Sequence, residues 1–167
     1  MAKTAALMIA AAAACALTVG IAGADDTSGP SRAELEQKFA ATLRGAVLSG
    51  KWRLLQDGKI GDERPEEYRI ESAEKVEGDT WKITARVRYA EHDLRAPLHV
   101  KVHWAGDTPI ISVTDLKFFG FGPYTARVMV YRDLYSGTWF GPGHGGLMQG
   151  KVTREAAGDT APAASDQ

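Results

Sequence analysis

The clearest pattern in the chain is an alternation of apolar and polar positions between residues 81 and 104. It forms two runs, which the short polar segment Ala90 to Asp93 separates. The apolar positions are Trp81, Ile83, Ala85, Val87 and Tyr89 in the first run, and Leu94, Ala96, Leu98, Val100, Val102 and Trp104 in the second. A period of two residues is typical of half-buried strands, and the short break predicts that the two strands pair as an antiparallel hairpin.

Similar runs on both sides of this pair predict further strands. The predicted strands are Ala46 to Leu55, Glu66 to Val76, Trp81 to Tyr89, Leu94 to Trp104, Ile110 to Leu116, Tyr124 to Tyr131, Tyr135 to Phe140 and Leu147 to Val152. Asp57 to Pro65 contains several turn-forming residues and is expected to be a longer loop. Pro97 has no N–H to donate, which predicts that the fourth strand is an edge strand or has a local break in its ladder.

A single amphipathic helix is predicted before the strands. Ser31 lies three residues before Glu34, which is a capping-box pattern for the start of a helix. The apolar stripe that follows consists of Leu35, Phe39 and Leu43. We expect the helix to end near Arg44 and to cover an edge or one open end of the sheet. A helix that binds a partner is the alternative.

About eight short strands with mostly hairpin-length links predict an all-β fold, an antiparallel up-and-down meander. Eight such strands can close into a barrel, which removes the exposed edges that promote aggregation. We therefore expect a closed barrel with one N-terminal helix. A two-sheet sandwich is the alternative, because the sequence does not distinguish Greek-key order from a simple meander.

Residues 1–24 have the pattern of a secretory signal peptide. Lys3 precedes an apolar run that ends at Ala22, and Ala22-Gly23-Ala24 is a small-x-small cleavage site. Cleavage there predicts an exported protein, periplasmic or extracellular, and lipidation at Cys15 is the alternative. The rest of the chain is then divided into a flexible lead-in (25–30), a helix-and-barrel domain (31–154) and a disordered tail (155–167).

Composition excludes several function classes. The chain has 20 Lys and Arg residues against 21 Asp and Glu residues, so it has no basic excess for nucleic acid or anionic lipid. Cys15 is the only cysteine and lies in the predicted signal peptide. The mature protein would therefore have no disulfide and no thiol nucleophile. We expect no transmembrane segment after removal of the signal peptide.

Three short motifs resemble the calycin group of β-barrels, which includes the lipocalins and avidins. They are Gly50-x-Trp52 on the first predicted strand, Thr114-Asp115 near the end of the fifth, and Arg154 after the last. The resemblance implies a lipocalin-like barrel that carries a ligand, with Trp52 as a plug at one end beneath Arg154. The sequence departs from the lipocalin pattern at Leu116, where that motif has tyrosine. The Thr-Asp pair also follows the fifth predicted strand rather than the sixth.

In a meander, alternate loops share one end of the barrel, and we expect any binding mouth where the longer loops gather. These predicted loops are 57–65, 90–93, 117–123 and 141–146. The candidate ligand-binding residues are Asp115, Phe118, Phe119, Phe121, Tyr124 and His144. The aromatic loop is either a plug that caps the core or a lid or docking patch. Asp115 is expected to point inward, for a strand-end hydrogen bond or a polar ligand contact.

No catalytic residue, cofactor or metal site is assigned. His99 and His103 share a strand face, but four residues of strand separate them by roughly 13 Å, which is too far for one ion. The segment Gly141 to Gly146 lacks the lysine and the following helix of a phosphate-binding loop. No Gly-x-Ser-x-Gly motif is present.

The leading prediction is non-catalytic binding of a small, partly apolar ligand inside the barrel. The second hypothesis is an envelope scaffold module, in which the barrel is filled and the aromatic loop contacts another envelope protein. The third is a small hydrolase or isomerase that uses His144, His92 or Asp115. Small inward residues would leave a cavity and large ones would fill it, and the predicted inward faces contain both.

Overall fold

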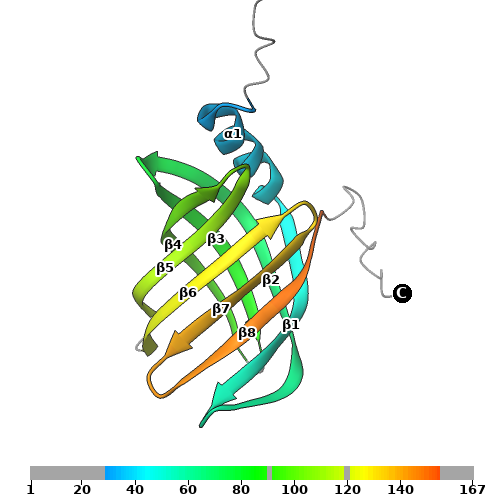
Figure 1. The fold of residues 1–167 in the computed structure, drawn as a ribbon, viewed down its shortest axis with the longest axis vertical. Helices are drawn as coiled ribbons and strands as arrows, with labels where there is room; N and C mark the ends of the chain where they lie inside the picture. The colour runs from blue at the N-terminus through cyan, green and yellow to red at the C-terminus, as the bar shows by residue number, and fades with distance from the viewer. Residues whose placement is uncertain (1–28, 90–91, 119–120, 155–167) are drawn as a thin grey trace, which may run out of the picture.

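In the computed structural model the chain forms one closed β-barrel with a helix at one end (Figure 1). The structure describes residues 29–89, 92–118 and 121–154. The predicted signal peptide (1–24), most of the predicted lead-in (25–30) and the predicted tail (155–167) lie outside these residues.

The barrel wall consists of eight antiparallel strands in sequence order, and the helix α1 (Arg32–Leu43) precedes them. The strands are β1 (Ala46–Gln56), β2 (Lys59–Glu77), β3 (Thr80–Tyr89), β4 (His92–Ala105), β5 (Thr108–Phe118), β6 (Phe121–Tyr131), β7 (Leu134–Gly141) and β8 (His144–Arg154). β1 also pairs with β8, from Ala46 opposite Arg154 to Leu55 opposite Gly145, which closes the barrel. The predicted meander, barrel closure and N-terminal helix are confirmed, and the sandwich alternative is excluded.

The predicted loop at 57–65 is wrong, because the strands extend into it. Asp57 and Gly58 have φ angles of 50° and 72° and alone connect β1 to β2. An Asp-Gly pair with two positive φ angles is typical of the tight hairpin turn whose twist matches that of its strands. β2 therefore begins at Lys59, and Pro65 lies within it, opposite Lys51 of β1.

The predicted aromatic loop at 117–123 is also mostly strand. β5 continues to Phe118 and β6 begins at Phe121, and these two residues are paired. The register between the two strands shifts twice, between Val113 and Leu116 and again between Leu116 and Phe118. Such bulges change which residues face inward, because one extra residue reverses the parity of a strand.

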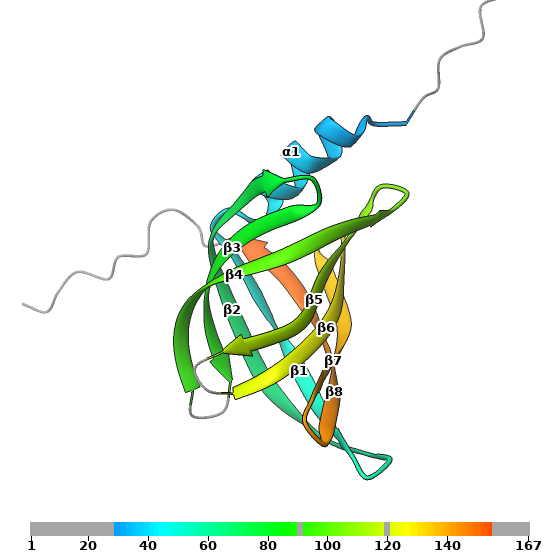
Figure 2. The same cartoon turned by 90° about the vertical axis from the view of Figure 1, so that its left-hand side faces the viewer.

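The helix covers one end of the barrel, as the sequence predicted. The capping box is present, with the Ser31 N–H donating to Glu34 Oε2 over 2.7 Å. Phe39 on its buried face packs edge-on against Trp81, with ring centroids 5.0 Å apart, and against Trp104 at 6.1 Å. Figures 1 and 2 show the helix at the end opposite the β1–β2 and β7–β8 turns. Within the described residues, no helix is long and apolar enough to cross a bilayer.

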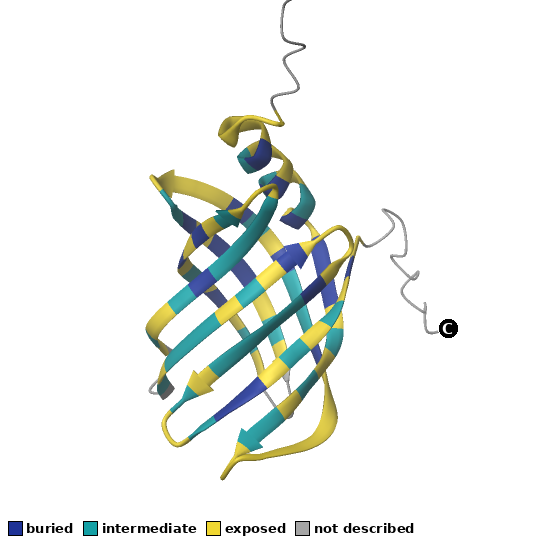
Figure 3. Cartoon of the chain, viewed as in Figure 1, coloured by how far each residue is buried: buried dark blue, intermediate teal, exposed yellow. Residues whose placement is uncertain are grey.

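The strand residues alternate between a buried inner face and an exposed outer face, which appears as bands along the ribbons in Figure 3. The tightest part of the core lies under the helix, where Leu43, Trp81 and Val102 are almost completely buried. His99 and His103 are both exposed, as expected for the outer face. The helix therefore shields these core side chains from solvent.

The wall between β4 and β5 is paired along only part of its length. Their ladder runs from Lys101 opposite Ser112 to Ala105 opposite Thr108. Pro97 lies on the part of β4 that pairs with β3 but not with β5. Since proline cannot donate a backbone hydrogen bond, it suits such a position. Of the two predictions for Pro97, the local break in the ladder is confirmed.

Candidate functional site

The inside of the barrel contains two adjoining cavities. The first, here called the apolar chamber, has a volume of about 230 Å³ and is lined by side chains from all eight strands and by Leu43 of α1. The second, called the aromatic chamber, has a volume of about 160 Å³. Its lining residues are Trp52, Glu66, Tyr68, Val87, Tyr124 and Trp139. Tyr68, Val87 and Trp139 line both cavities, so one ligand could occupy the two together.

Strand positions place the aromatic chamber toward the end away from the helix. Trp52 lies near the last residue of β1, Tyr124 near the start of β6 and Trp139 near the end of β7. Those strand ends are the ones that the β1–β2, β5–β6 and β7–β8 connections join. The chamber is therefore at the end where the sequence predicted a binding mouth.

The only buried acidic side chain among the described residues is Glu66, which is 6% exposed. It lies on β2 in phase with Tyr68 and Ile70, so all three point into the barrel. Its Oε1 accepts a hydrogen bond from the Tyr135 hydroxyl over 2.8 Å, and its Oε2 accepts one from the Tyr68 hydroxyl over 2.9 Å. Each carboxylate oxygen therefore has one tyrosine donor.

Burial dominates the electrostatics of this cluster. Desolvation raises the pKa of Glu66 above its usual value, although the hydrogen bonds from Tyr135 and Tyr68 act in the opposite direction. Desolvation, reinforced by the Glu66 charge, strongly raises the pKa of Tyr135. Tyr135 therefore stays protonated and remains a hydrogen-bond donor throughout the ordinary pH range.

Two glycines make room for the Tyr135 ring. Gly50 and Gly150 are paired across β1 and β8. A Cβ at Gly50 would overlap the Gln149 carbonyl oxygen and the Tyr135 hydroxyl oxygen, and one at Gly150 would overlap the Ser49 carbonyl oxygen and lie 2.7 Å from a carbon of the Tyr135 ring. The glycine of the Gly-x-Trp motif is thus needed for close approach to an inward tyrosine, which is a specific reason for its presence on a strand.

The rings of the aromatic chamber contact one another at angles far from parallel. Trp139 lies 6.0 Å from Trp52 and 6.3 Å from Tyr124, measured between ring centroids. The Arg64 guanidinium lies over the Trp52 ring, 5.2 Å from its centroid. The indole N–H of Trp52 is buried, and no atom of the described residues accepts a hydrogen bond from it. The aromatic chamber therefore has both an unused donor and a buried carboxyl group among its lining residues.

Of the predicted site residues, the structure brings Trp52 and Tyr124 to the cavity. It does not bring Trp52 and Arg154 together, because they lie six positions apart along β1 in the β1–β8 register. Arg154 instead donates a hydrogen bond to the carbonyl of Ala41 in the helix. The cation that contacts the tryptophan is Arg64, from the neighbouring strand β2.

Asp115 and His144 lie at the mouth end but do not line either cavity. Asp115 is exposed, has a φ angle of 52°, and its backbone N–H donates to Thr125 Oγ1 over 3.3 Å. His144 is half-buried, and its ring lies 5.5 Å from that of Trp139. Its Nδ1 is 2.8 Å from the Pro142 carbonyl oxygen, so Nδ1 carries the hydrogen.

The remaining predicted site residues belong to the aromatic segment and to the catalytic alternative. Phe118 and Phe121 are strand residues whose side chains lie outside the described part of the structure, as do all of Phe119 and the His92 side chain. Within the described ranges, no three His, Cys, Asp or Glu side chains gather at a spacing that could hold a metal ion.

The prediction missed four residues of the site, Glu66, Tyr68, Tyr135 and Trp139. A signal for Glu66 exists, because it shares the parity of Tyr68 and Ile70 on a strand whose inner face is apolar. The contact between Glu66 and Tyr135 could not be found in this way, since 69 residues separate them.

Comparisons with known proteins leave the family open, because no family model, no curated protein and no solved structure matches the chain. The eight-stranded closed barrel is compatible with the calycin resemblance. Membership of that group does not follow from architecture alone.

The buried carboxyl predicts a specific pH dependence of stability. Because the pKa of Glu66 is raised in the fold above the usual 4.5, its contribution to stability is full below pH 4.5. That contribution is lost as the pH rises from there through the folded pKa. Exposed carboxyl groups with lowered pKa values, such as Glu34 and Glu71, act in the opposite sense. Because Glu34 and Glu71 are present in both proteins, their effect cancels when the stability of wild type is subtracted from that of Glu66→Gln.

We expect the free energy of unfolding of Glu66→Gln, minus that of wild type, to increase between about pH 4 and pH 7. Urea unfolding followed by circular dichroism at several pH values measures this difference. A difference that stays constant across the range would mean that burial does not perturb Glu66.

Proposed function

We propose that this protein is an exported, non-catalytic barrel that binds a small, partly apolar ligand in its interior. The observation that carries the proposal is the pair of adjoining cavities inside a closed barrel, one apolar and one containing a buried carboxyl group. A small pocket with mostly apolar walls and a few polar groups is the usual form of a ligand site. The N-terminal sequence pattern supports export.

The cavity dimensions support a small ligand. Ligand pockets commonly have volumes of roughly 300–1,000 Å³, and the chambers of about 230 and 160 Å³ reach the lower end only when taken together. Eight-stranded barrels have interiors just wide enough for side chains or for one small ligand. We therefore expect a molecule with one aromatic ring or a short branched chain, rather than a lipid or a large cofactor.

Binding of the neutral probe 2-phenylethanol, measured by isothermal titration calorimetry, tests the proposal. We expect saturable binding to wild type and a loss of about tenfold or more in the Ala126→Leu variant, because each added buried methylene displaces ligand volume. Ala126 lines the apolar chamber. Met129→Leu is the matched control, since Met129 lies on the outer face of the same strand and is 43% exposed.

Absence of saturable binding to wild type, for this neutral probe and for a protonated amine of the same size, would contradict the proposal. Equal binding to wild type and Ala126→Leu would also contradict it, because the probe would then be outside the barrel. Circular dichroism of each variant verifies that the fold is retained.

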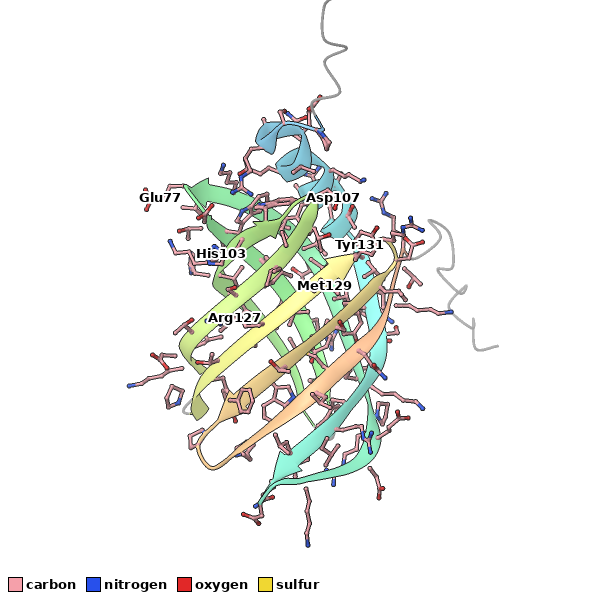
Figure 4. The ribbon with its side chains drawn as sticks, viewed as in Figure 1. Glu77, His103, Asp107, Arg127, Met129 and Tyr131 are labelled. Carbon is pink, nitrogen blue, oxygen red and sulfur yellow. The ribbon has the colours of Figure 1, made fainter. Side chains whose placement is uncertain are left out.

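A second candidate function is supported by the outer surface. Met129, Tyr131 and Leu134 are 43%, 44% and 56% exposed and border a surface hollow of about 490 Å³. Figure 4 labels Met129 and Tyr131 along the outer side of β6. Such a patch suits contact with another envelope protein. This function would become the better proposal if 2-phenylethanol does not bind inside the barrel.

A further inference from the structure

The polar half of the interior has the composition of an ammonium-binding site. The aromatic chamber combines one buried carboxyl group, from Glu66, with the rings of Trp52, Tyr68, Tyr124 and Trp139. Resting on the proposed function, we propose that the ligand is a small amine whose protonated nitrogen binds beside Glu66 and whose apolar part occupies the apolar chamber.

The charge of Glu66 is the first argument. The side chain is 6% exposed, and no Lys, Arg or His of the described residues forms an ion pair with it. A buried ionised carboxylate is strongly unfavourable unless it is paired as well as hydrogen-bonded. Burial raises the pKa of Glu66 for this reason, and a ligand ammonium group would stabilise its ionised form.

The free acceptor positions of Glu66 are the second argument. A carboxylate offers about four lone-pair positions, and the hydroxyl groups of Tyr68 and Tyr135 use one on each oxygen. Both tyrosines are donors to the carboxylate, so they hold it in place and leave lone pairs for a further donor. An ammonium group has up to three N–H donors and matches this arrangement.

The aromatic lining is the third argument. Faces of tryptophan and tyrosine attract cations that lie within about 6 Å of the ring centroid. The rings of Trp52, Tyr124 and Trp139 are mutually inclined, with angles of 66° and 62° between neighbouring ring planes. Inclined rings present several faces and edges to one small volume. The Arg64 guanidinium already occupies one face of Trp52, so a ligand cation would use the other ring faces of the chamber.

The remaining ligand classes fit less well. A carboxylate or phosphate would place a second negative charge beside Glu66, with which no Lys, Arg or His of the described residues forms an ion pair. A neutral alcohol can donate one hydrogen bond but leaves the buried charge uncompensated. An apolar amine matches both chambers, because Tyr68, Val87 and Trp139 connect the polar half to the apolar half.

Three probes that differ only in their end group test the inference by calorimetry at pH 7. They are 2-phenylethylamine, which is protonated, 2-phenylethanol, which is neutral, and 3-phenylpropanoate, which is negative. We expect the amine to bind wild type about tenfold or more tightly than the alcohol, as a charge-assisted hydrogen bond implies, and the carboxylate not to bind. In Glu66→Gln we expect the amine and the alcohol to bind within about twofold of each other.

Glu67→Gln is the matched control, because Glu67 neighbours Glu66 but pairs with Arg69 instead of lining the chamber. It should retain the full preference for the amine. If Glu66→Gln still bound the amine more tightly than the alcohol, Glu66 would not be the ammonium-binding group. Loss of this preference in Glu67→Gln would also overturn the role of Glu66. If Glu66→Gln does not fold, the test uses wild type instead, and the methyl NMR signals of Val87 are followed while the amine is added. Unchanged Val87 signals would overturn the inference.

Failure of the inference and failure of the proposed function are distinguishable. If none of the three probes binds wild type, the proposed function fails and the inference fails with it. If the alcohol binds as tightly as the amine, the cavity is a ligand site without selectivity for a cation, and only the inference fails.

Discussion

Replacing Trp81 with alanine is expected to lower the free energy of unfolding by about 3–5 kcal/mol. Trp81 is 2% exposed, lies on the inner face of β3 and packs edge-on against Phe39 of the helix. The substitution removes a large buried side chain and leaves a cavity where the helix meets the barrel. Urea unfolding followed by far-UV circular dichroism measures the loss.

Trp104→Ala is the matched control for this prediction. Trp104 also contacts Phe39, but it is half-buried and its ring centroid is farther away, at 6.1 Å. We expect a clearly smaller loss in this variant, because less apolar surface is removed from contact with the core. A loss in the Trp81 variant no larger than that in the Trp104 variant would contradict the described packing of the helix end.

Replacing Tyr135 with alanine is expected to have a similarly large effect, about 3–5 kcal/mol. The ring is 2% exposed and fills the space that Gly50 and Gly150 leave open. The substitution also removes the hydroxyl that donates to Glu66, so a buried oxygen loses its protein donor. The same unfolding measurement applies.

The variant Tyr135→Phe separates the two contributions. It keeps the ring and removes only the hydrogen bond, so we expect a loss of about 1–3 kcal/mol. If Tyr135→Phe were as stable as wild type, the hydroxyl would not satisfy a buried carboxyl group. If Tyr135→Ala lost no more than Tyr135→Phe, the ring would not be part of the core.

These two residues belong to the same core cluster but support different features of the barrel. Trp81 packs against α1 at the end that the helix covers, whereas Tyr135 donates a hydrogen bond to the carboxyl group that lines the aromatic chamber. The helix thus covers one end of the barrel, and the aromatic chamber lies toward the other end. This distribution suits a site that a small molecule enters from the mouth side, where the alternate hairpin turns gather (Figure 2).

Strand periodicity was sufficient to predict the architecture. All predicted strands are present, because alternation over one buried face strongly specifies both the strand and its register. The capping box between Ser31 and Glu34 likewise located the start of the helix. These are local signals, and each is decided by residues that are close in sequence.

The candidate site depended on features that are not local. Asp115 was expected to share the inward parity of Val113, but the register shift between Val113 and Leu116 changes the parity, and Asp115 is exposed. Glu66 is not among the predicted site residues, because the turn-forming residues 57–65 predict a loop before it and make it the first residue of a strand. In the structure it lies inside the long strand β2, where its inward orientation follows from alternation.

Contacts between strands that are distant in the sequence likewise could not be predicted from the sequence. The hydrogen bond between Glu66 and Tyr135 depends on the curvature that brings β2 and β7 to face each other. The separation of Trp52 from Arg154 depends on the register of the closing β1–β8 pair. Both require the closed barrel, and a short motif contains no information about register.

The central claim is that the barrel interior is a ligand site, and methyl NMR of wild type during titration with 2-phenylethanol tests it most directly. Binding in the interior should give saturable shifts at inward methyl groups, such as those of Val87, Val128 and Met148, which line the chambers. The exposed methyl groups of Val76 and Leu134 should remain unchanged. Shifts confined to the exposed methyl groups, or no saturable shift at any, would contradict the claim.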